Sequence, residues 1–286
     1  MNPDPYLDLL KRCLTADLYD ESAWSVLTGW RSGGGGWGQR CRQALARFLK
    51  RRGYLLVRTR PFNPKLRAEG TDWPAFGYSM IGLARLDNIE TCVRSVVADD
   101  IPGDLIETGV WRGGSTIFMR AILRQLGITD RTVWVADSFE GLPEPTTAED
   151  QARGAAWDMS SNSYLAVSLE QVQAHFARFG LLDDQVRFLK GWFKDTLPGA
   201  PIKRLAVLRL DGDMFEATMD ALQSLYTRVS PGGFVIVDDY GSWPACRAAV
   251  DEFRATNGVT AEMMPVAGGA VYWRVPRTQS KDAVYA

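Results

Sequence analysis

The sequence predicts an α/β fold built on a mostly parallel β-sheet with helices on both faces. From about Tyr78 onward, helical and strand patterns alternate, which is typical of βαβ units with right-handed crossovers. Two apolar segments, 205–210 and 234–237, are continuous runs of Leu, Val, Ile, Ala and Phe with a single Arg, as expected for strands buried on both faces. With 286 residues, the chain suits one large core and a small accessory piece.

The first 71 residues predict an accessory part of the molecule. Apolar residues at helical spacing indicate an amphipathic helix over 5–27, without a strand partner. A Gly-rich linker at 31–38 follows, and then a basic helix at 40–52, whose charges we interpret as a solvated face. We therefore divide the chain into an N-terminal helical and lid extension, residues 1–71, and a main domain, residues 72–286.

The main domain is predicted element by element from the period of its apolar residues. Helices are expected over 79–97, from 115, and over 168–179, 215–229 and 245–256. Strands are expected at 104–109, 132–137, 186–190, 205–210 and 234–237, with further candidates near 263 and at 271–274. Two long connections, 57–76 and 141–167, are predicted as loops that shape a binding pocket.

Composition excludes several classes of function. With 33 basic and 34 acidic residues the formal charge is −1, which gives no bulk attraction to nucleic acid. The four cysteines form no CxxC or Cys/His cluster, so we expect neither zinc nor a disulfide framework, and the cytoplasm is the compartment that fits. The sequence shows neither a signal-peptide pattern nor an apolar run long enough to span a membrane.

A glycine-rich turn at 107–115 has the pattern of a nucleotide-binding βα turn. Gly109 permits a tight turn after an apolar strand, while Gly113 and Gly114 allow a ligand to approach the start of the next helix. Asp137 ends the following strand, where an acid typically binds two ribose hydroxyls. The turn lacks a GxGxxG fingerprint and a Walker lysine. Ordinary turn chemistry, and a helix-capping role for Asp137, stay open as alternatives.

Four aspartates follow the two most apolar strands. Asp211 and Asp213 end the first strand, and Asp238 and Asp239 end the second. Carboxylates rarely end buried strands unless a cation meets them, and open α/β sheets bind ligands at this edge. We expect Asp211 and Asp213 to face the same side of an extended segment. A hard-metal site is therefore predicted, with helix capping and a solvated turn as the alternative reading.

Several motifs together resemble the macrocin O-methyltransferase family, whose members methylate sugars of macrolide and novobiocin-type natural products. The resemblance rests on the segments 78–82, 104–114, 137–143, 191–193, 210–213 and 237–240. It implies a class I methyltransferase fold, Rossmann-like, with a seven-stranded sheet. It also implies S-adenosyl-L-methionine (SAM) and Mg²⁺ as cofactors, and an acceptor hydroxyl on a sugar.

The resemblance also implies a role for individual residues. It assigns cofactor contacts to Met80, Ile81, Glu107, Gly109, Ser115, Asp137, Ser138, Ser168 and Trp192. It assigns the metal to Asp211, Asp238 and Asp239, and the general base to Asp213. Ser168 has a second interpretation, because the sequence 168–171 is also a capping box.

These observations predict a SAM- and Mg²⁺-dependent O-methyltransferase that acts on a small or glycosylated acceptor with neighbouring hydroxyls. A nicotinamide oxidoreductase would need a better glycine fingerprint and a hydride-handling Tyr/Lys pair. A non-catalytic cofactor binder would not need an intact Asp213. Neither nucleic acid nor a membrane is expected as a partner, and a homo-oligomer, in which a second subunit helps to shape the pocket, stays open.

Overall fold

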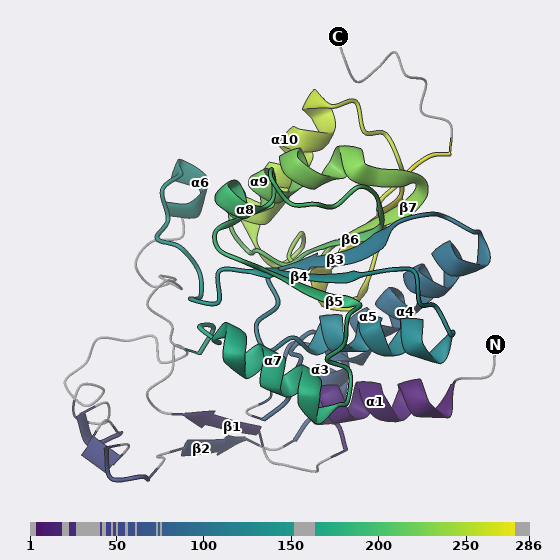
Figure 1. The fold of residues 1–286 in the computed structure, drawn as a ribbon. Coiled ribbons are helices and arrows are strands. Elements are labelled where there is room, and N and C mark those ends of the chain that lie inside the picture. Colours follow the sequence, from purple (N-terminus) through teal and green to yellow (C-terminus); the bar gives the residue numbers. More distant parts are fainter. Residues whose placement is uncertain are drawn as a thin grey trace.

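The protein is a three-layered α/β molecule, in which helices cover both faces of one central sheet (Figure 1). The computed structural model describes residues 4–18, 23–26, 41, 44–46, 48–49, 51–54, 57–60, 62–72, 74, 76–151 and 164–277. The Gly-rich segment 31–38 and parts of the predicted basic helix lie outside the described residues.

The central sheet has seven strands in the order β5-β4-β3-β6-β7-β9-β8. The strands are β3 (Asp104–Thr108), β4 (Val133–Asp137), β5 (Val186–Lys190), β6 (Leu205–Leu210), β7 (Val229–Val237), β8 (Met264–Pro265) and β9 (Val271–Arg274). The first five are parallel, while β9 runs antiparallel to β7 and to β8. Because β3 pairs with both β4 and β6, the strand order reverses there, and ligands bind at such switch points.

Helices lie on the two faces of the sheet as predicted. The face below the sheet in Figure 1 carries α1 (Pro5–Thr15), α4 (Gly82–Ala98), α5 (Gly114–Gln125) and α7 (Leu169–Arg178). The opposite face carries α8 (Phe193–Thr196), α9 (Phe215–Leu225) and α10 (Pro244–Thr256). The short helices are α3 (Pro64–Glu69), α6 (Ala148–Gln151) and the 3-10 turns at Tyr226–Arg228 and Ala267–Gly269.

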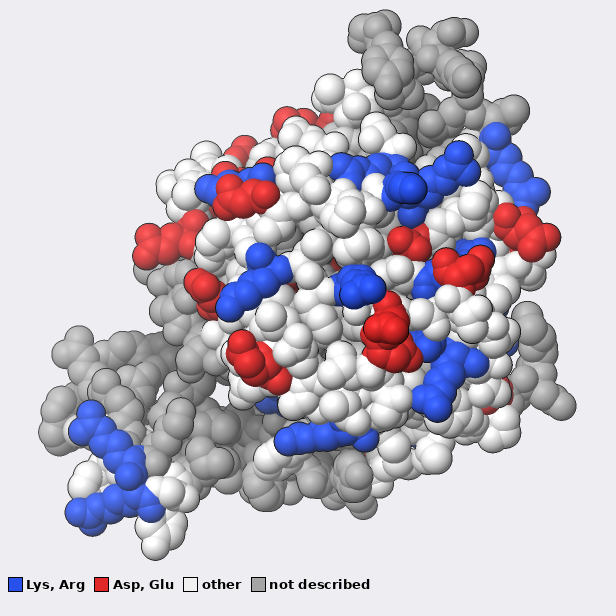
Figure 2. All heavy atoms as spheres, viewed as in Figure 1, with Lys and Arg blue, Asp and Glu red and all other residues white. Residues whose placement is uncertain are grey.

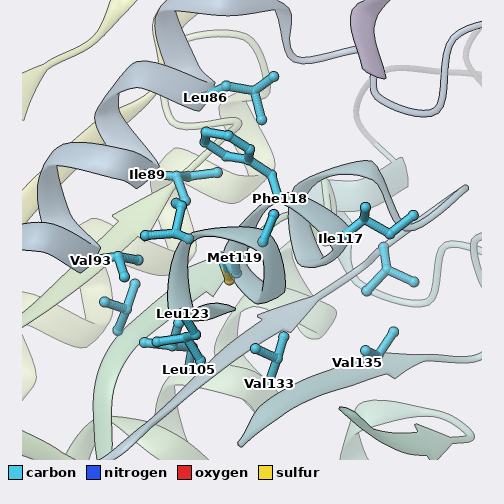
Figure 3. Close-up of a cluster of buried hydrophobic side chains, with 14 of the residues drawn as sticks. Leu86, Ile89, Val93, Leu105, Ile117, Phe118, Met119, Leu123, Val133 and Val135 are labelled. Carbon is cyan, nitrogen blue, oxygen red and sulfur yellow. The ribbon is translucent and has the colours of Figure 1, made fainter. Parts of the chain in front are cut away.

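Two hydrophobic clusters, one on each face, hold the layers together. In the first, Phe118 of α5 lies beside Leu86 and Ile89 of α4, and Leu123 of α5 lies beside Leu105 of the sheet, as Figure 3 shows. In the second, α9 and α10 cover the other face around the fully buried Trp273. Strands β3, β4, β6 and β7 are therefore enclosed on both sides, which explains why they are so continuously apolar.

The N-terminal segment differs from the prediction in two places. The predicted helix over 5–27 ends at Thr15, because Ala16 takes a left-handed conformation, and residues Ala23–Val26 form β1. The predicted loop over 57–76 contains β2 (Val57–Arg60), which pairs antiparallel with β1, and α3. Apolar spacing could not separate helix from strand here, because the pairing partner of β1 lies more than 30 residues away.

Charged side chains on the face in Figure 2 intermingle, with basic and acidic residues close together over most of the described part. This arrangement matches the near-zero net charge and gives no broad single-sign field on that face. Among the described helices, we find none with the length and apolar character of a membrane span.

Helix α1 is part of the main core, although it precedes the predicted domain boundary at residue 72. Leu14 is fully buried in the first cluster, whereas Leu9 on the same helix is 53% exposed. We expect Leu14→Ala to lower the free energy of unfolding by about 2–5 kcal/mol, because it leaves a cavity between packed elements. Leu9→Ala should change it by less than about 0.5 kcal/mol. Urea denaturation measures both, and equal effects would show that α1 is a separable extension.

Candidate functional site

One cavity of about 720 Å³ opens at the carboxyl ends of the parallel strands, beside the switch point between β3 and β6. The structure brings nearly all residues of the predicted site to its wall. These are Met80, Ile81, Glu107, Gly109, Ser115, Asp137, Ser138, Trp192, Asp211, Asp213, Asp238 and Asp239. The predicted cofactor and metal residues, which lie up to 159 positions apart in the sequence, therefore share one space.

Gly109 shows why the first βα turn requires glycine. Its φ of +88° lies in the left-handed region, and a Cβ there would lie 1.8 Å from the carbonyl oxygen of Asp211. A side chain at this position would push β3 and β6 apart at their carboxyl ends. Gly114 meets a similar limit, because a Cβ would lie 2.4 Å from the carbonyl oxygen of Tyr78. The Gly114 N–H donates to that oxygen at 3.0 Å, which holds the segment before Met80 against the turn.

Asp137 braces the same turn from the end of β4. Its Oδ2 accepts from the Val110 N–H at 2.7 Å, and its Oδ1 accepts from the Phe139 N–H at 2.7 Å. No described helix begins directly after it, so the helix-capping alternative does not hold. Burial raises the pKa of Asp137, while these N–H donors oppose the shift. A second, longer hydrogen bond reaches each oxygen, from the Trp111 N–H to Oδ2 and from the Ser138 hydroxyl to Oδ1, both at 3.4 Å.

Ser168 lies apart from the other predicted cofactor residues. It does not line the cavity, and its Oγ accepts from the Gln171 N–H at 3.3 Å. The Gln171 side chain in turn accepts from the Ser168 N–H at 3.0 Å. This reciprocal pair is the capping box that starts α7, which is the second interpretation that the sequence allowed.

Three carboxylates form the metal-compatible cluster that the sequence predicted. Asp211, Asp238 and Asp239 each offer an oxygen, and these oxygens lie within 4.8 Å of one another. The Oδ2 of Asp239 is buried and has no hydrogen-bond partner among the described residues. Burial, followed by repulsion from Asp213, Asp211 and Asp238, raises the pKa of Asp239 well above its usual value. A buried acceptor without a donor beside two further carboxylates fits a hard divalent cation.

Two buried arginines, which sequence reasoning missed, support this cluster. Arg209 is fully buried on β6, where the strand register sets it beside Glu107 of β3. Its guanidinium contacts Glu107, Asp238 and, at 2.7 Å, the Oδ2 of Asp211. Arg85 of α4 pairs with the other oxygen of Asp238. A charged residue inside the apolar run 205–210, followed directly by acids, was the available sequence signal.

These contacts shift the pKa values of the groups involved. Burial alone would lower the pKa of Arg209, but Asp238, Asp211 and Glu107 raise it well above its usual value. Burial raises the pKa of Glu107 to about 8, against the effect of Arg209. Burial and the Asp238 charge also raise the pKa of Asp211. These four carboxylates, of which Asp211 is half-buried and the others buried, outnumber the two arginines, so the cluster either keeps negative charge or takes up a proton.

Asp213 reaches the cavity in a different way from the one predicted. The prediction of an extended segment from Asp211 to Asp213 is wrong, because Asp213 has a φ of +59°. The Met214 N–H donates back to the carbonyl oxygen of Gly212 at 2.5 Å, which closes a tight three-residue turn. Asp213 nevertheless lines the same cavity as Asp211 and Asp239.

The seven-stranded sheet with helices on both faces, and the cavity at its switch point, define a class I α/β methyltransferase fold. The model of the macrocin O-methyltransferase (TylF) family matches residues 3–275, so the chain belongs to this family. The match begins well before the predicted boundary at residue 72. Family membership makes the chain an O-methyltransferase, rather than a nicotinamide oxidoreductase or a non-catalytic cofactor binder.

Individual relatives agree with this placement. The 8-demethyl-8-(2,3-dimethoxy-α-L-rhamnosyl)-tetracenomycin-C 4'-O-methyltransferase of Streptomyces olivaceus is 58% identical over 209 residues, which cover 73% of this chain and 79% of that protein. The demethyldecarbamoylnovobiocin O-methyltransferase of Streptomyces niveus is 53% identical over 221 residues, which cover 76% and 82%. The structure of the O-methyltransferase NovP matches this chain with 45% sequence identity and a TM-score of 0.79. The matched region covers 95% of this chain and 98% of that one.

Removal of the Arg209 charge should destabilise the fold. Arg209→Met leaves Glu107 and Asp238 buried without one of their cations, so we expect the free energy of unfolding to fall by about 3–5 kcal/mol. Arg187→Met, on the exposed side of β5, is the matched control and should stay within about 0.5 kcal/mol. Urea denaturation measures both variants. A stability of Arg209→Met equal to that of the control would mean that the ion pairs do not support the sheet.

Proposed function

We propose that this chain is a SAM- and Mg²⁺-dependent O-methyltransferase that methylates a hydroxyl of a sugar or a glycosylated natural product. The observation that carries the proposal is the shared cavity. The glycine turn with Asp137, and the cluster of Asp211, Asp238 and Asp239, line one space at the switch point of the sheet. A sulfonium donor and a cation-bound acceptor would therefore meet there.

The first two parallel strands would hold the cofactor. Asp137 would accept hydrogen bonds from ribose hydroxyls, as acids at the end of the second strand typically do. Met80 and Ile81 would meet the methionine end, next to Glu107, Gly109 and Ser115. Ser138 and Trp192 line the same cavity and would flank the nucleoside. The acidic wall would also favour the positive sulfonium.

The acidic cluster would hold the metal. Its donor set consists of carboxylate oxygens, which suit Mg²⁺ and disfavour zinc. When bound there, the cation would lower the pKa of a coordinated hydroxyl and fix its position. Arg85 and Arg209 hold Asp238 from two sides, so this ligand is oriented before the cation arrives. Asp213 would take the proton that the hydroxyl loses as it attacks the methyl group.

The relatives support the choice of acceptor class. The acceptors named for the S. olivaceus and S. niveus enzymes are natural products, and the first carries its reacting sugar as a rhamnosyl group. A vicinal diol would offer two oxygens to one cation. The name of the S. olivaceus acceptor places methoxy groups on that sugar, so we include an ether oxygen as the second oxygen of the pair.

Metal dependence can be tested without relying on turnover alone. We expect excess EDTA to abolish methyl transfer and Mg²⁺ to restore it. Asp239→Asn should weaken Mn²⁺ binding by about 10- to 100-fold, and calorimetry measures this affinity. Because the raised pKa of Asp239 lets a proton compete with the cation, wild-type affinity should rise as pH increases. Asp184→Asn, an exposed residue far from the cavity, is the control. Full activity in EDTA contradicts the metal role.

Asp213→Asn tests the general base. We expect the single-turnover rate to fall by about 10²–10⁴, because the amide cannot accept the hydroxyl proton. The acceptors for the assay are those of the S. olivaceus and S. niveus relatives, with labelled SAM as donor. Affinity for S-adenosylhomocysteine should stay unchanged, and Asp195→Asn, exposed on α8, should react like the wild type. An unchanged rate in Asp213→Asn would exclude this residue as the base.

A further inference from the structure

Asp213 has a left-handed backbone conformation. Its φ of +59° is uncommon for a residue with a side chain, and the Met214 N–H donates to the carbonyl oxygen of Gly212 across the turn. Helix α9 starts two residues later, at Phe215. The direction of the Asp213 carboxylate therefore depends on where α9 begins and on what holds that end of the helix.

The cap of α9 comes from a distant part of the chain. Met214 stands at the N-cap position and offers no side-chain acceptor. Instead, Asp150 accepts from the Phe215 N–H at 2.7 Å through Oδ1, and lies 3.4 Å from the Glu216 N–H through Oδ2. A carboxylate suits this place, because the first N–H groups of a helix lack partners and carry partial positive charge.

Asp150 is itself held in a defined geometry. The Thr147 hydroxyl donates to its Oδ2 at 2.8 Å, and the Asp150 N–H donates to the Thr147 Oγ1 at 3.2 Å. A second bond joins the same two elements, from the Thr146 hydroxyl to the Oε2 of Glu216 at 2.6 Å. In Figure 1, α6 lies beside the start of α9, which agrees with these contacts.

The segment that ends in Asp150 also forms a wall of the cavity. Gly141, Leu142, Pro143, Glu144 and Thr146 all line it, opposite the strand ends that carry the acids. Asp150, which caps α9, therefore lies at most nine positions from these lining residues in the sequence. Two hydrogen bonds, one from Thr146 to Glu216 and one from Phe215 to Asp150, join this segment to the start of α9.

We propose that Asp150 is a positioning residue, which fixes the start of α9 and thereby aims the Asp213 carboxylate into the cavity. The inference rests on the proposed function, since it takes Asp213 as the general base. It adds a coupling between the cavity wall at 141–146 and the base, Asp213. The wall at 141–146 and the base move together, so an acceptor that displaces this wall also displaces Asp213.

A double-mutant cycle tests the proposal. We expect Asp150→Ala to slow single-turnover methyl transfer by about 10- to 100-fold, because small misplacements of a catalytic group carry costs of this size. Its affinity for S-adenosylhomocysteine should stay within about twofold of the wild type, because the cofactor turn is untouched. Asp150→Asn keeps an oxygen acceptor and should recover most of the rate. Glu149→Ala, exposed on the same helix, is the matched control.

The decisive comparison uses Asp213→Asn as background. If Asp150 acts through Asp213, the double variant is no slower than Asp213→Asn alone. Additive losses, or a wild-type rate in Asp150→Ala beside a slow Asp213→Asn, overturn the positioning role. A wild-type rate in Asp213→Asn instead overturns the proposed base.

Hydrogen exchange gives a second readout, which needs no acceptor. Amides at 213–218 should exchange faster in Asp150→Ala, while those at 107–115 stay unchanged. Unchanged exchange at 213–218 would also overturn the proposal.

Discussion

The site depends on one buried interaction, the contact of the Arg209 guanidinium with three acids at the ends of neighbouring strands. Glu107 is on β3, Asp211 follows β6, and Asp238 follows β7. Carboxylates this close repel one another and are expensive to bury, so without the cation they would protonate or separate the strands. The arginine allows the sheet to place several acids at one edge. The residual negative charge at that edge then suits a cation.

The second constraint is the close approach of β3 and β6 at the switch point. Gly109 passes so near to the Asp211 carbonyl that only hydrogen fits between them. The glycine turn and the acidic edge are therefore in direct contact at this point. This proximity is what in-line methyl transfer requires, because the donor sulfur and the acceptor oxygen have to be held a short distance apart.

Much of the fold and site could be read from the sequence, because strong periodicity and buried strands leave clear patterns. Acids at the carboxyl ends of β3, β4, β6 and β7 are predicted to meet at one edge of the sheet, and they do. The features that the sequence did not predict depend on contacts with residues far away in the sequence. Strand β1 forms by pairing with β2. The segment Asp211-Gly212-Asp213 gives no sequence signal for the left-handed conformation of Asp213. Arg85 pairs with Asp238, which lies 153 positions later in the sequence.

One part of the site is held by the paired strands and another part is formed by loops. This division explains how one family could serve several acceptors. The glycine turn at 107–115 and the acids are held in place by strand pairing and by Arg209. Asp213 follows β6 in a turn that leads into α9, and this helix is capped by Asp150, which follows the cavity-lining segment 141–146. Loops tolerate substitution better than buried strands. If the proposed role of Asp150 holds, a new acceptor can be fitted by altering the segment 141–146, provided that Asp150 still caps α9.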